Sequence, residues 1–114
     1  MKRTVVGLWL RLLAERKVRW VPGMAWLRPP SGAPDDYGDR GRVDSYIFPP
    51  AGSVPDPNDP ATLGCLLAMA REAWSNPGAS CGAFGGTWYF CADTTRAVGA
   101  TEATALLAAI EATP

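Results

Sequence analysis

Apolar residues recur at helical spacing near the start of the chain. The pattern places them on one helix face, with charged residues between them, and predicts a helix over residues 3–17. The apolar positions are Val5, Leu8, Trp9, Leu12 and Leu13.

A second helix is predicted from Pro60, because Asp59 is a favourable N-cap and proline is tolerated at the first helical position. The sequence Asn76-Pro77-Gly78 is expected to end it. Its apolar stripe is the longest in the chain, so we expect it to lie at the centre of the core. The stripe contains Leu63, Leu66, Leu67, Ala70 and Trp74.

A third helix is predicted to begin near Thr101 and to bury one face. That face contains Ala103, Leu106, Leu107 and Ile110.

Strands are predicted over Met24–Arg28 and Val43–Phe48, and a meander of short strands over Ser80–Val98. Gly85-Gly86 fits a two-residue turn that needs positive φ. That turn would pair residues whose numbers sum to 171. It would place Cys81 opposite Phe90 and Cys91 opposite Ser80, with the two thiols on opposite faces.

Two segments are predicted to be irregular. Residues 29–42 are rich in proline, aspartate and glycine and indicate an exposed loop, and five prolines make residues 49–60 a connector without a central strand.

With 114 residues we expect one domain over residues 1–114. The 12 glycines and 11 prolines exclude a pure helix bundle. The predicted class is α+β, with a small antiparallel sheet of three or four strands, about three helices and the order α-β-β-α-β-β-α.

The absence of histidine excludes Ser-His and Cys-His mechanisms. Cys65, Cys81 and Cys91 form no Cys-x-x-Cys motif, and we expect buried, inert, reduced thiols. We therefore expect no catalytic residue, no cofactor and no metal.

The first apolar stretch is too short for an export signal or a membrane span, so the expected compartment is the cytoplasm.

The formal net charge is zero, but it is unevenly distributed. Residues 1–28 hold seven basic side chains and one acidic, a net of +6, whereas residues 29–114 hold four basic and ten acidic, a net of −6. Tryptophan, tyrosine and arginine dominate binding hot spots, and polar loops commonly carry function. The first third and the following loop are therefore the candidate partner-binding surface. Its residues are Arg16, Arg19, Trp20, Trp26, Arg28, Asp35, Asp36, Tyr37 and Arg40.

Several of these residues also fit different roles. The basic segment could contact nucleic-acid phosphates, and ordinary core packing would account for Trp20 and Trp26 equally well. Asp35, Asp36 and Asp39 could form a cation site of a small metal-dependent enzyme, although their spacing is also that of a solvated turn.

Several segments resemble small phage and prophage proteins of the phage ABA-sandwich type. They are the run from Asp59 to Trp74, the later Trp88-Tyr-Phe strand, the ending from Gly99 to Ala112, and Trp20-Val-Pro-Gly-Met24. The resemblance implies a helix-sheet-helix domain and supplies no catalytic residues. By analogy with phage proteins of this size, we expect a non-enzymatic accessory protein in a bacterial host that binds and inhibits a host defence complex such as CRISPR-Cas. The sequence leaves the oligomeric state open.

Overall fold

The computed structural model describes residues 4–44, 48–93 and 95–114. Within them the chain forms three helices and six strands. The helices are α1 (Val5–Ala14), α2 (Pro60–Ala73) and α3 (Glu102–Glu111). The strands are β1 (Ala25–Arg28), β2 (Asp39–Arg42), β3 (Val54–Pro55), β4 (Ser80–Phe84), β5 (Thr87–Ala92) and β6 (Thr95–Gly99).

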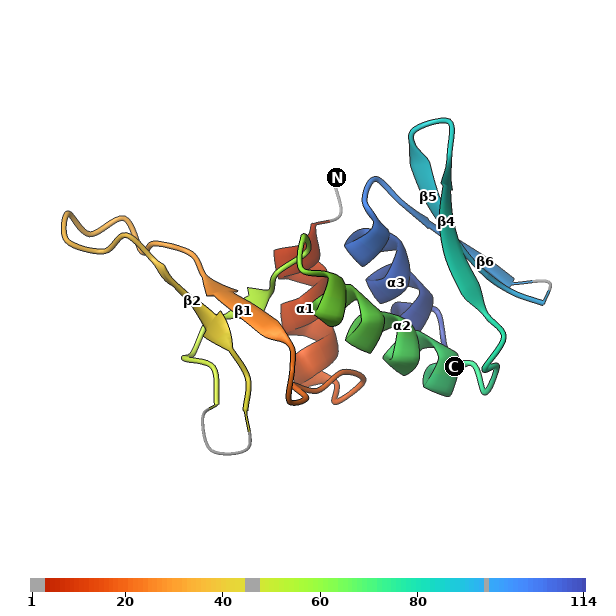
Figure 1. Cartoon of the computed structure of the whole chain (residues 1–114), viewed down its shortest axis with the longest axis horizontal. Coiled ribbons are helices and arrows are strands. Elements are labelled where there is room, and N and C mark those ends of the chain that lie inside the picture. The colour runs from red at the N-terminus through yellow and green to blue at the C-terminus, as the bar shows by residue number, and fades with distance from the viewer. Residues whose placement is uncertain (1–3, 45–47, 94) are drawn as a thin grey trace.

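The strands form two antiparallel sheets, with strand orders β2-β1-β3 and β4-β5-β6. Figure 1 shows the three helices in the middle of the molecule, with β1 and β2 on one side and β4, β5 and β6 on the other. The β1–β2 hairpin extends away from the helices, and the molecule measures 48 × 32 × 24 Å. None of the described helices combines the length and apolarity that a membrane crossing needs.

Helix α3 lies at the centre of the core. Every residue from Ala103 to Ile110 is buried, because α3 contacts α1, α2 and all three strands of the second sheet. The N-terminus of α3 is closed by a capping box between Thr101 and Thr104. At its C-terminus, the Lys17 ammonium donates to the carbonyl oxygens of Glu111 and Thr113, where a cation is favourable.

A buried hydroxyl joins the first sheet to α2. Thr62 Oγ1 accepts a hydrogen bond from the Ala25 nitrogen at 2.7 Å and donates one to Asp59 at 2.8 Å. Asp59 also caps α2 and binds both terminal nitrogens of Arg42 on β2. The pKa of Asp59 lies below its ordinary range. The largest cause is the hydrogen bond from the Arg42 guanidinium, and the hydrogen bonds from Thr62 have smaller effects.

The α+β class and the approximate order of elements are confirmed. The structure contains the predicted first helix and a strand at the predicted position Met24–Arg28. It also contains the Asp59 cap and the Gly85-Gly86 turn. The pairing of Cys81 with Phe90 and of Ser80 with Cys91 is also as predicted.

The arrangement of the strands differs from the prediction. They divide between two sheets, and the helices lie between them, unlike the helix-sheet-helix layering that the resemblance implied. The predicted loop 29–42 ends early, because residues 39–42 form β2 against β1. The connector 49–60 contains the two-residue strand β3 at a sheet edge, where proline is tolerated.

No strand is found at the described positions of the predicted strand Val43–Phe48. Val43 and Asp44 lie outside any strand, and residues 45–47 lie outside the described residues.

The core is also centred differently from the prediction. Leu63 and Leu67 of α2 and its C-cap Trp74 are only half-buried, whereas α3 is covered on all sides. The alanines between the apolar residues of α3 are small enough to pack closely, so the helix buries more than one face.

Gly99→Ala is expected to lower the free energy of unfolding by about 1 to 3 kcal/mol. A Cβ there would lie 2.4 Å from the Ala105 nitrogen and 2.5 Å from Thr104 Oγ1, so α3 would have to move off β6. Gly64→Ala in α2 is the matched control. It is exposed, has nothing within 4 Å, and is expected to raise stability by about 0.5 to 1 kcal/mol. Denaturant titration measures both, and a neutral Gly99→Ala would contradict this close packing.

Thr62→Val is expected to cost about 1 to 3 kcal/mol, because it keeps the shape of the side chain but leaves the Ala25 N–H without its acceptor. Thr62→Ser keeps the hydroxyl and is expected to lose less. The comparison uses unfolding free energies at neutral pH. A larger loss for Thr62→Ser than for Thr62→Val would contradict this and assign the role of Thr62 to its methyl group.

Candidate functional site

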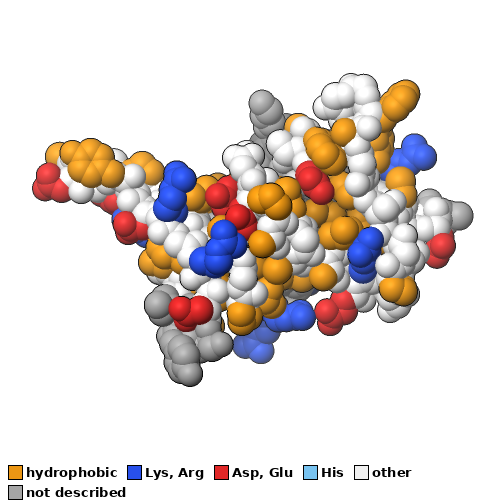
Figure 2. Space-filling view, viewed as in Figure 1, with side chains coloured by type: hydrophobic (Ala, Val, Ile, Leu, Met, Phe, Trp, Pro, Cys, Tyr) orange, Lys and Arg blue, Asp and Glu red, His pale blue; other side chains and the backbone are white. Residues whose placement is uncertain are grey.

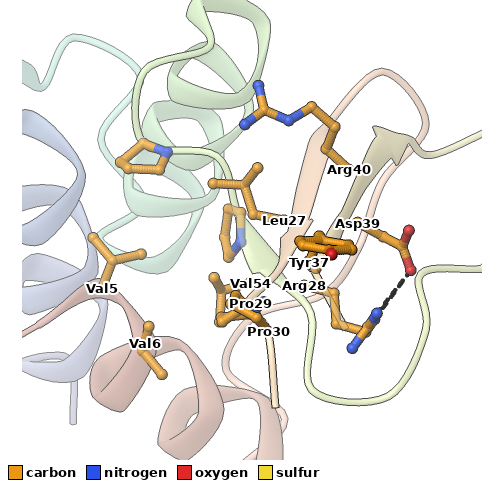
Figure 3. Close-up of a pocket in the computed structure, with 13 residues that line it drawn as sticks. Val5, Val6, Leu27, Arg28, Pro29, Pro30, Tyr37, Asp39, Arg40 and Val54 are labelled. Atoms are coloured by element: carbon orange, nitrogen blue, oxygen red, sulfur yellow. Dashed lines mark hydrogen bonds and ion pairs between the residues drawn. The ribbon is translucent and has the colours of Figure 1, made fainter. Parts of the chain in front are cut away.

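A cleft of about 660 Å³ lies between α1 and the first sheet. We call it the hairpin cleft. Figure 3 shows Val5 and Val6 of α1 on one side and Tyr37, Asp39 and Arg40 of the hairpin on the other. The cleft is therefore lined by segments that are distant in sequence.

The lining of the hairpin cleft is apolar on the β1–β3 side. Leu27 pairs with Arg40 of β2 on one side and with Val54 of β3 on the other, so these three side chains share one sheet face. Pro55 and Pro57 continue the apolar lining. A cation from β2 thus lies beside an apolar surface.

Asp36 organises the loop between β1 and β2. Its carboxylate accepts two hydrogen bonds from the Arg28 guanidinium, at 3.1 and 2.9 Å, and further ones from the backbone nitrogens of Ser31 and Gly38. Arg28 also binds Asp39 at 2.9 Å, the contact dashed in Figure 3. The side chains of Arg28 and Asp36 are only 25% and 19% exposed. The network restrains the loop and holds the pKa of Asp36 well below its ordinary range, with Arg28 as the largest cause.

Tyr37 and Arg40 remain accessible on this ordered frame. Tyr37 is 87% exposed, and it follows Asp36 directly in the chain. Arg40 is exposed and forms no ion pair with any described residue. An exposed tyrosine and an exposed arginine beside an apolar surface are residues of the types that typically anchor a protein interface.

The structure brings five of the nine predicted partner-binding residues together at the cleft or on its supporting loop: Arg28, Asp35, Asp36, Tyr37 and Arg40. Asp35 is exposed on the same loop. Trp26 lies on β1 with its ring against Gly41, where an added Cβ would be 2.7 Å from the ring.

The remaining three lie elsewhere. Arg16 and Arg19 are exposed between α1 and β1, and Arg19 faces Glu72 of α2 at 3.3 Å. Trp20 packs edge-on against the buried Trp9, with ring centroids 4.8 Å apart. Core packing therefore accounts for Trp20.

Many basic side chains of the first segment are paired within the molecule. Arg11 forms an ion pair with Glu111, Lys17 caps α3, and Arg28 is held by two carboxylates. On the face in Figure 2, positive and negative side chains are interspersed. This arrangement is unlike the continuous basic patch that phosphate binding uses.

The loop aspartates have defined protein partners as well. Asp36 and Asp39 share the Arg28 guanidinium, whose charge opposes a bound cation. Among the residues that the structure describes, no group of three histidine, cysteine, aspartate or glutamate side chains is arranged to hold a metal ion.

The three cysteines are free and half-buried, not buried as expected. Burial, with smaller effects from Glu102 and Cys91, raises the pKa of Cys81 to about 11. A raised pKa favours the protonated thiol over the nucleophilic thiolate at neutral pH.

The apolar part of the cleft was missed by sequence reasoning. Val6 is 42% exposed and lies off the buried stripe of α1. Its position as an apolar residue outside that stripe is the one sequence signal that it is available for another contact. The participation of Val54 and Pro55 depends on their long-range pairing with β1, which no local pattern shows.

Comparison with protein-family models, curated proteins and solved structures gives no match to this chain.

Asp36→Asn is expected to destabilise the protein most at neutral pH. A carboxylate whose pKa is lowered by folding stabilises the native state above its unfolded pKa of about 3.9, and this contribution is lost as the pH falls below that value. The difference in unfolding free energy between wild type and Asp36→Asn should thus shrink below about pH 4. Asp35→Asn, at the exposed neighbour, is the control and should leave stability nearly unchanged. A difference for Asp36→Asn that is independent of pH would contradict the ionic role.

Proposed function

We propose that this protein is a non-enzymatic binding protein that engages a partner protein through the hairpin cleft. Tyr37 and Arg40 are the anchors, and the Arg28–Asp36 pair is the support that orients them. Arg28 and Asp36 therefore contribute to binding through the loop and not through direct contact.

The observation that carries this proposal is the exposure of Tyr37 on a hydrogen-bonded loop. The loop is fixed by several hydrogen bonds to one carboxylate, yet its aromatic ring is 87% exposed. A loop ordered before binding avoids much of the entropy cost of association, so its contacts contribute more fully to affinity.

The chemistry of the cleft specifies the kind of partner. Val6 and Leu27 offer apolar contact, and Arg40, which has no ion pair among the described residues, offers a guanidinium suited to a carboxylate. The fitting occupant is a protein segment with an apolar side chain next to an aspartate or glutamate. A host defence complex as the source of this segment, and the phage setting, rest on the resemblance alone.

Tyr37→Ala and Arg40→Glu are each expected to weaken partner binding about tenfold or more while leaving thermal stability nearly unchanged, because both side chains are exposed. Partners are first captured from bacterial lysate with the wild-type protein. Affinities of the purified pair are then measured by calorimetry.

Arg96→Glu is the charge-matched control, since Arg96 is exposed on the other sheet. It is expected to leave the affinity unchanged. Loss of binding with Arg96→Glu but not with Arg40→Glu would move the interface to the second sheet and contradict the proposal. Binding that DNA abolishes, with steep salt dependence, would favour the nucleic-acid alternative.

A further inference from the structure

We propose that the free edge of β4 pairs with β4 of a second copy of this chain, so that two second sheets join into one antiparallel sheet of six strands. This inference concerns the opposite end of the molecule from the hairpin cleft. It is independent of the proposed function.

The edge of β4 differs from the other sheet edges that the structure describes. Proteins protect strand edges from pairing with charged side chains or proline. β2 carries Asp39, Arg40 and Arg42, β3 carries Pro55, and β6 carries Arg96. β4 has the sequence Ser-Cys-Gly-Ala-Phe, with no charge and no proline.

The hairpin turn determines which backbone groups of β4 are free. Gly85 and Gly86 have φ of 60° and 80°, as a two-residue type I′ turn requires, and Phe84 lies opposite Thr87. The pair that flanks such a turn is hydrogen-bonded, and hydrogen-bonded pairs then alternate along the ladder. Ser80, Gly82 and Phe84 therefore direct their backbone groups to β5. Cys81 and Ala83 direct theirs to the open edge.

A two-fold axis through Gly82 brings the free backbone groups of two β4 strands opposite each other. Antiparallel pairing about that axis places Cys81 of one copy opposite Ala83 of the other, and the reverse, while the two Gly82 residues form a non-hydrogen-bonded pair. All four free groups of each strand then have a partner. No other centre pairs all five residues.

The side chains are compatible with the same arrangement. On the outer sheet face the axis sets Phe84, 82% exposed, next to the small Ser80 of the second copy. Nothing lies within 4 Å of a Cβ added at Gly82, so the centre of the contact is open. The paired strands contain no charge and the whole chain has formal net charge zero, so electrostatic repulsion does not oppose the contact.

The contact is short, and this determines the expected strength. Stable homodimers generally bury more than about 1,000 Å², which five residues of strand pairing do not supply alone. We therefore expect a weak dimer whose population rises between micromolar and millimolar concentrations.

Sedimentation velocity over that concentration range tests the inference on the full chain. Ala83→Pro removes an outward N–H without removing a bond to β5, and is expected to reduce the association constant about tenfold or more. Ala83→Val keeps the N–H and is the matched control, expected to dimerise as the wild type does. Ala83→Lys adds an edge charge at an exposed position and is expected to give a folded monomer even if the proline variant unfolds.

Amide chemical shifts add a readout that is independent of the variants. The Cys81 and Ala83 amides should shift with concentration more than those of Gly82 and Tyr37. A wild-type protein that is monomeric throughout the range would overturn the inference. So would a dimer that Ala83→Lys leaves intact, or one that Tyr37→Ala abolishes. None of these results bears on partner binding at the cleft.

Discussion

Helix α3 must be covered on every side, and the rest of the architecture follows from that requirement. Its eight consecutive buried residues, Ala103 to Ile110, offer no polar face to water. One sheet covers only one side of such a helix, so α1 and α2 cover the others. Because Gly99 has no side chain, β6 can approach the start of α3 closely. The centre of the molecule is therefore held mainly by apolar packing.

The first sheet adds directed polar interactions to its apolar packing, in which Val54 joins the core. It is small, and its links to the helices include the hydroxyl of Thr62 and the ion pair of Arg42 with Asp59. Its projecting loop depends on a second ion pair, between Arg28 and Asp36. Hydrogen bonds and ion pairs have defined directions, whereas apolar packing does not, so they fix the orientation of the hairpin at the cleft.

Local signals were sufficient for several elements and failed for others for a physical reason. Asp59 and Gly85-Gly86 act on their immediate neighbours, so the cap of α2 and the register of the second hairpin could be predicted. β2 has the sequence Asp-Arg-Gly-Arg, which contains no strong strand former, and it is extended because β1 pairs with it. At the site, Tyr37 and Arg40 were identified from residue type, but the apolar lining depends on contacts between distant segments.

The tryptophans are distributed over the layers of the molecule. Trp26 lies in the first sheet, Trp88 in the second, and Trp9 in the helices between them, where it packs against Trp20. Trp74, the C-cap of α2, donates its indole N–H to the Ala109 carbonyl oxygen of α3 at 2.8 Å. Each layer therefore contains its own fluorophore. Variants that retain one indole would reveal optically whether the hairpin, the helices and the second sheet lose their structure together or in sequence.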